Sequence, residues 1–175
     1  MPEVRSLCER LVPGEIPHVL KVNPPPGAKP DDCIGNVQSV IETHGGSVEY
    51  GWRLWETLPS LMIEAEFHAV WIDTEGRRHD VTPTPMPRLE SVVFLADSAL
   101  VYEGRQIDNV RVPLKDDPLI TDFIETAEDF YEVTNRGELA NYHGELVLTP
   151  EMRAIQTRQI DLQLAILSKY FVSPA

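Results

Sequence analysis

The pattern of apolar and polar residues changes twice along this chain, and each change predicts a different kind of element. Helices are favoured before residue 45: a short one over residues 3–12, and one over residues 32–44 in which apolar side chains recur at helical spacing. Asp31 or Asp32 is the predicted N-cap of the second helix, and Gly45-Gly46 is its stop signal. The prolines of residues 21–30 predict a linker or an extended segment between them.

From Ser47 onward the period changes to two, with β-branched and aromatic residues, which is typical of strands. The turn residues Asp73–Gly76 predict a hairpin, because Gly76 can adopt the positive φ that such a turn requires. A second hairpin is possible between the last two strands. The expected strands cover residues 47–56, 62–72, 77–83, 91–97 and 106–114.

The second change follows Lys115, after which the pattern is helical again over residues 116–137 and 149–171. Thr149 is a predicted cap, with Pro150 at the first helical position. A helix, then antiparallel strands, then two helices is the order of an α+β fold. We predict a single domain over residues 1–175, with an N-terminal segment (1–30), a helix-and-sheet core (31–114) and a helical part (115–175).

Composition and charge narrow the function classes. A chain of 175 residues with a net charge of -13 has room for one core, and it repels nucleic acid unless it carries a basic patch, which we do not find. No apolar run reaches the roughly 18 residues that cross a bilayer, and the N-terminus lacks the features of a signal peptide. A cytoplasmic protein that contacts neither nucleic acid nor membrane is expected, with both cysteines as thiols.

Cys33, His68 and Asp80 are the residues in which we expect chemistry. Cys33 falls in the first turn of its predicted helix, where the helix dipole favours a thiolate, although two preceding carboxylates oppose it. If the hairpin turn centres near Thr74, His68 faces Asp80 across the strands with Cβ atoms about 5 Å apart. Asp80 would then orient the imidazole and leave its other nitrogen free as a base. A shift of register by one residue would place the two on opposite faces.

A cysteine at a helix start, followed by His and Asp on adjacent antiparallel strands, resembles the layout of the transglutaminase-like and wider papain-like superfamily. The resemblance covers residues 31–85, and FHAVWIDTEGRRHDVTP is similar to the family's His-to-Asp hairpin. It implies a papain-like α+β core in which an N-terminal nucleophile helix and two C-terminal helices pack with the sheet. It also implies that Cys33 is the nucleophile, His68 the general base and acid, and Asp80 the orienting group.

These residues predict a thiol-dependent amide hydrolase or acyltransferase, whose substrate is a peptide or another amide-containing molecule. Gly35 is expected to leave room for the substrate, and the Cys33 amide to serve as one oxyanion donor. No cofactor is expected. The candidate substrate-binding residues are Asn36, Trp52, Trp55 and Glu66.

Two alternatives stay open. The first is a non-catalytic binding or regulatory module on the same fold, because residues 116–138 carry eight acidic side chains against one basic side chain and can attract a basic protein partner. The second is a zinc site, although the spacing of the possible ligands is not that of a known zinc motif and we predict no bound metal. Those ligands are Cys33, His44, His68, His79 and His143.

Overall fold

The computed structural model describes residues 2–84, 89–142 and 146–171. The chain divides into two compact units, of which the first comprises residues 1–55 and 65–102 and the second residues 56–64 and 103–175. Helices combine with an antiparallel sheet, so the predicted α+β class is confirmed. The single domain over residues 1–175 stays a prediction.

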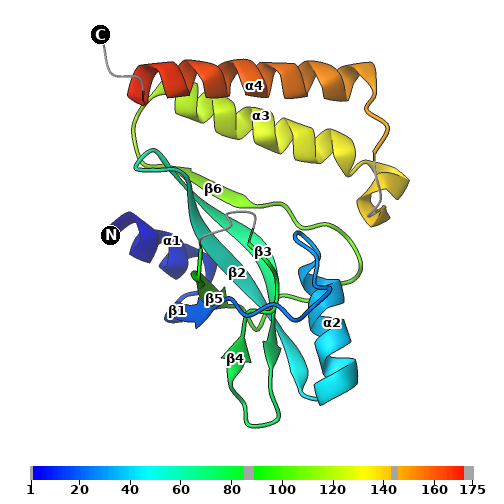
Figure 1. The fold of residues 1–175 in the computed structure, drawn as a ribbon. Helices are drawn as coiled ribbons and strands as arrows, with labels where there is room; N and C mark the ends of the chain where they lie inside the picture. The colour runs from blue at the N-terminus through cyan, green and yellow to red at the C-terminus, as the bar shows by residue number, and fades with distance from the viewer. Residues whose placement is uncertain (1, 85–88, 143–145, 172–175) are drawn as a thin grey trace. The chain divides into compact units, whose positions relative to one another are not determined.

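The first unit contains two helices, α1 (Pro2–Leu11) and α2 (Cys33–His44), and most of the sheet (Figure 1). Its strands follow the order β1-β5-β2-β3-β4. β5 pairs antiparallel with both β1 and β2. The strand bounds are β1 (His18–Lys21), β2 (Ser47–Leu58), β3 (Met62–Ile72), β4 (Arg78–His79) and β5 (Ser91–Ala96).

Both faces of β3 carry apolar side chains, because adjacent residues of a strand point to opposite sides of the sheet. Ala69 is buried in a cluster with Val37 and Val40, so α2 packs against its face. Val70 belongs to a second cluster, which the sheet strands build from their own side chains. Each face of the sheet therefore has its own apolar layer. Cys33 packs against the layer between α2 and the sheet, which sets its position. The second cluster consists of Leu20, Val70, Val92, Phe94 and Ala96.

The second unit contains β6 (Val110–Pro113), α3 (Pro118–Thr134), the 3-10 helix η1 (Gly137–Asn141) and α4 (Pro150–Tyr170). α3 and α4 lie side by side (Figure 1). The Thr149 hydroxyl accepts a hydrogen bond from the Met152 amide at 3.2 Å, and Pro150 opens α4, which confirms the predicted helix start. The buried core of this unit is formed by Leu58, Leu61, Met62, Ile120, Phe123, Ile124 and Ile166.

The prediction of a second hairpin between residues 91–97 and 106–114 is wrong. A strand has two edges, and β5 uses both, one for β1 and one for β2. β6 pairs with β3 instead. β1 was not predicted, because its four residues are too short to establish a period. The strands expected over residues 77–83 and 106–114 are shorter than predicted, because only Arg78–His79 (β4) and Val110–Pro113 (β6) are strands. The other predicted helices and strands form near their expected bounds.

Candidate active site

Cys33 is the first residue of α2, and its side chain is half-buried. Asp32 caps the helix, because its Oδ1 accepts a hydrogen bond from the Gly35 amide at 3.1 Å. A Cβ atom at Gly35 would lie 2.5 Å from that Oδ1. The space at Gly35 is therefore occupied by the Asp32 carboxylate, and the expectation that it is left for a substrate is corrected.

His68 and Asp80 meet, although not directly across the strands as the sequence predicted. β4 pairs with β3 so that Trp71 lies opposite His79, and the continuation of this register sets Asp80 opposite Val70. The turn is closed by a hydrogen bond between residues 73 and 77, which centres it one residue later than predicted. Side chains alternate along a strand, so the resulting displacement by two residues leaves His68 and Asp80 on one face. His68 Nε2 lies 3.2 Å from Asp80 Oδ2.

The imidazole and the carboxylate are both completely buried, with exposed fractions of 1% for the His68 side chain and 0% for that of Asp80. Their facing atoms lie at hydrogen-bond distance but are not aligned for a regular hydrogen bond. Phe94 approaches the His68 ring edge-on, with 6.4 Å between the ring centroids. A buried carboxylate next to an imidazole favours the charged form of the ring.

Opposing effects act on the proton affinity of His68. Burial lowers its pKa, and the positive charge of Arg53 acts in the same direction. Interactions with Asp80 and with the Cys33 thiol raise it and outweigh both, so the pKa of His68 lies above its ordinary value. Because Nε2 faces Asp80, Nδ1 is the ring nitrogen that remains for the interaction with Cys33. The three residues named from the sequence therefore interact in one place.

The proline-rich segment, residues 21–30, holds Asp80 in position. Val22 forms a parallel bridge with Asp80, and the Asn23 amide donates a hydrogen bond to the Asp80 carbonyl at 2.9 Å. On the side-chain side, Asp80 Oδ1 accepts a hydrogen bond from the Thr82 amide at 3.0 Å. One carboxylate oxygen is thus used for anchoring, which leaves Oδ2 directed at His68.

Asn36, a predicted substrate contact, ties α2 to this anchor. Its side chain accepts from the Lys29 amide at 2.9 Å and donates to the Lys29 carbonyl at 2.7 Å. It also donates to the Thr82 hydroxyl at 3.3 Å. Asn36 is buried and lies one helical turn after Cys33, so it links α2 to the residues that hold Asp80.

The other predicted substrate contacts have partners within the protein. Glu66 Oε2 accepts hydrogen bonds from Arg53 and from Trp55 Nε1, the latter at 2.6 Å, and the Arg53 guanidinium lies 4.2 Å above the Trp55 ring. Arg53 is buried, and its Nη1 has no hydrogen-bond partner among the described residues. Trp52 is buried and donates from Nε1 to Asp97 at 3.0 Å.

Three stacked aromatic rings near Cys33 were not named from the sequence. Tyr50, Phe67 and Tyr102 are all half-buried, and we call them the aromatic shelf. The Phe67 ring stacks on Tyr102 at 5.6 Å and on Tyr50 at 5.7 Å between centroids. Tyr50 and Cys33 pack against the same apolar cluster. Phe67 directly precedes His68, and adjacent strand residues point to opposite faces, so no local sequence signal indicated this ring.

The remaining histidines of the described chain lie outside this group. His79 Nε2 is 2.9 Å from Asp73 Oδ2, and the hydrogen bond from the Arg77 amide is the largest cause that lowers the pKa of Asp73. His44 meets the Trp71 ring edge-on. Within residues 2–84, 89–142 and 146–171, no three His, Cys, Asp or Glu side chains cluster closely enough to hold a metal ion. His143, a possible ligand in the zinc alternative, lies outside the described residues.

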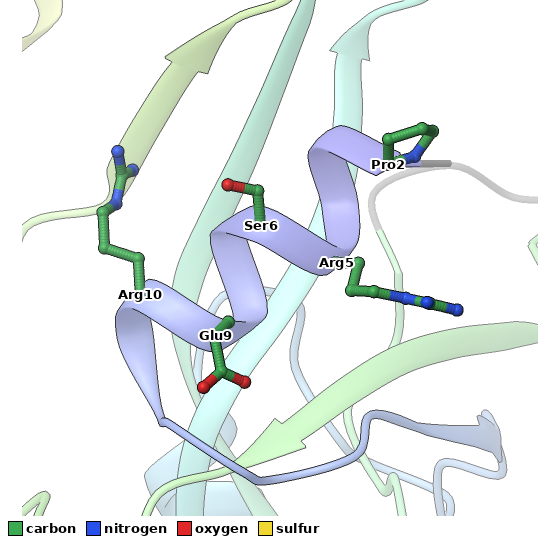
Figure 2. A pocket seen from close by; sticks show the side chains of 5 residues that line it. All are labelled: Pro2, Arg5, Ser6, Glu9 and Arg10. Atoms are coloured by element: carbon green, nitrogen blue, oxygen red, sulfur yellow. The ribbon is translucent and has the colours of Figure 1, made fainter.

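The surface of α1 carries a pocket whose lining contains none of Cys33, His68 and Asp80 (Figure 2). Its lining residues are all exposed, and in Figure 2 the Arg5 and Arg10 side chains extend away from each other. Catalytic pockets bring polar groups together, which these side chains do not do. We therefore place the candidate chemistry at Cys33. The pocket is lined by Pro2, Arg5, Ser6, Glu9 and Arg10.

Comparison of the chain with protein-family models, with curated proteins and with solved structures finds no match. Across the part of the chain that the structure describes, no helix is both long enough and apolar enough to cross a membrane.

Proposed function

We propose that the protein is a thiol-dependent amide hydrolase or acyltransferase with a Cys33-His68-Asp80 triad, built on a core like that of the transglutaminase-like and papain-like proteins that residues 31–85 resemble. Its substrate is a peptide or another molecule with an amide bond. The observation that carries this proposal is the 3.2 Å approach of buried His68 to buried Asp80, together with the interaction of the same imidazole with Cys33 at the start of α2.

Each of the three residues has a defined role in the reaction. His68 takes the proton of the Cys33 thiol, and the sulfur attacks the carbonyl carbon, forming a tetrahedral oxyanion to which the Cys33 amide donates. The C–N bond breaks, His68 passes its proton to the departing amine, and a thioester remains. Water or a second amine attacks the thioester, transfers a proton to His68 and releases the acid or the new amide, which returns the thiol. Asp80 orients the ring and stabilises its charged form throughout.

The test is the alkylation rate of each cysteine with iodoacetamide, followed by peptide mass spectrometry. At about pH 6 a free thiol is almost fully protonated and reacts slowly. An imidazolium beside Cys33 should make it react about tenfold faster than the same residue in the chain unfolded in urea. Cys8 is an internal control, because it is buried and burial raises the pKa of its thiol.

Two histidine variants separate the triad from general effects. His68→Gln should remove the enhanced rate of Cys33. His79→Gln should retain it, because His79 pairs with Asp73 outside the triad. Release of a fluorogenic amine from a peptide library should occur with the native protein and stop in Cys33→Ala. A native Cys33 that alkylates no faster than the unfolded chain contradicts the proposal.

The second candidate is a non-catalytic module that binds a basic protein. The observation in its favour is the outer face of α3, where Glu125, Glu128, Asp129 and Glu132 are exposed and no lysine or arginine lies within the helix. It predicts an unreactive Cys33 and binding to a basic peptide that weakens as salt is added. The alkylation assay therefore distinguishes the two candidates.

A further inference from the structure

The route to the triad is limited to one side. His68 and Asp80 have almost no exposed surface, whereas the Cys33 side chain is half-buried. A substrate must therefore reach the sulfur from the exposed side of Cys33. The groups that border this approach determine which side chain is accepted next to the attacked carbonyl.

The aromatic shelf is one border of this approach. Its rings are stacked, with interplanar angles of 28° between Tyr50 and Phe67 and 20° between Phe67 and Tyr102. Tyr50 packs against the same cluster as Cys33, and Tyr102 interacts electrostatically with Cys33. Half-buried ring faces bind long aliphatic stems, and they also attract a cation placed over them.

Negative charge is the second feature of this approach. Burial is the largest cause that raises the pKa of Tyr102, and the further causes are Cys33, Tyr50 and Asp32, all of which are negative when ionised. Asp32 is exposed at the start of α2, directly before Cys33. A carboxylate near aromatic faces favours a positively charged head group and repels an anionic one.

We propose that the aromatic shelf and Asp32 form a binding subsite for a long, positively charged side chain, of the lysine or arginine type, next to the amide that Cys33 attacks. This rests on the proposed function. The stem lies against the rings of Phe67 and Tyr102, and the cationic head is held by the ring faces and by the Asp32 carboxylate. A substrate with an acidic side chain at the same position is rejected by Asp32.

The experiment uses peptidyl acyloxymethyl ketones, in which the Cys33 thiolate displaces the carboxylate from the methylene carbon and forms a stable C–S bond. Three probes differ only in the side chain next to the ketone: lysine, norleucine, which has the same stem length without charge, and glutamate. Labelling of Cys33 should be about fivefold to tenfold faster with the lysine probe than with the glutamate probe at low salt, and the ratio should fall as salt is added.

Two conservative variants test the parts of the subsite. Asp32→Asn keeps the helix cap but removes the charge. It should bring the ratio of the lysine-probe to the norleucine-probe labelling rate closer to one. Phe67→Leu keeps an apolar contact but removes the ring face. It should bring the same ratio of labelling rates closer to one, while labelling by the norleucine probe persists. Each rate is divided by the iodoacetamide rate of the same variant, so that changes in thiol reactivity cancel.

The outcomes separate the subsite from the triad. Enhanced iodoacetamide alkylation with equal labelling by the lysine and glutamate probes overturns the subsite and leaves the proposed function standing. Faster labelling by the norleucine probe than by the lysine probe shows an apolar subsite and also overturns the cationic assignment. Slow reaction of Cys33 with every reagent, iodoacetamide included, contradicts the proposed function itself.

Discussion

Replacing Asn36 with alanine removes a buried side chain that links α2 to the segments that hold Asp80 beside His68. Two of its hydrogen bonds join it to the Lys29 backbone, at 2.9 and 2.7 Å, and a third joins it to the Thr82 hydroxyl at 3.3 Å. Thr82 in turn donates its amide to Asp80 Oδ1. The substitution therefore loosens both the proline-rich segment and the anchor of Asp80.

The magnitude follows from the number of bonds and from their burial. A typical intramolecular hydrogen bond contributes about 1 kcal/mol, so the loss should be about 3 kcal/mol of unfolding free energy. For a chain of this length that corresponds to a drop of roughly 6–12 °C in Tm. The Lys29 groups lie at an exposed residue and can bond to water, whereas Thr82 is buried.

Thermal unfolding followed by circular dichroism measures this effect, and cysteine alkylation measures its consequence at the site. The matched control is Gln38→Ala, because Gln38 is exposed on the same helix and should change stability by less than about 0.5 kcal/mol. Asn36→Ala should also slow Cys33 alkylation at a temperature where the variant is folded. Equal stability of the two variants would refute the idea that Asn36 joins α2 to the site.

Two other predictions concern the buried histidine and the second unit. Because folding raises the pKa of His68, the contribution of His68 to stability is present below the ordinary histidine pKa and is lost as pH rises through the pKa of the folded state. The difference in unfolding free energy between the native protein and His68→Gln, measured by urea unfolding, should therefore shrink from about pH 6 toward higher pH. A difference that grows with pH would contradict this prediction. Ile166→Ala should cost about 2–5 kcal/mol because Ile166 is fully buried in the core of the second unit, whereas Leu164→Ala, at a position 59% exposed on the same helix, should cost little. Equal losses in the two variants would contradict the packing of α4.

The sequence by itself determined most of the helices and strands, although not β1, and it determined the candidate residues. Helix α2 begins where Asp32 can cap it and ends before Gly45, and β3 forms over the predicted residues 62–72. These signals are local, because capping and period depend on neighbours within one turn or one strand. The meeting of His68 with Asp80 could also be anticipated, since a hairpin keeps both residues on one face at the predicted register and at the observed one.

Tertiary structure alone decided how those residues are held and what surrounds them. The exact register depends on which hydrogen bond closes the turn, and the pairing of β5 with β1 depends on contacts between residues far apart in the chain. The role of Asn36 could not be predicted, because its partners come from the proline-rich segment and from the strand end at Thr82. The aromatic shelf likewise joins residues of two strands and a loop. Such contacts depend on packing between segments that are distant in the chain, and the local periodicity of a sequence does not predict that packing.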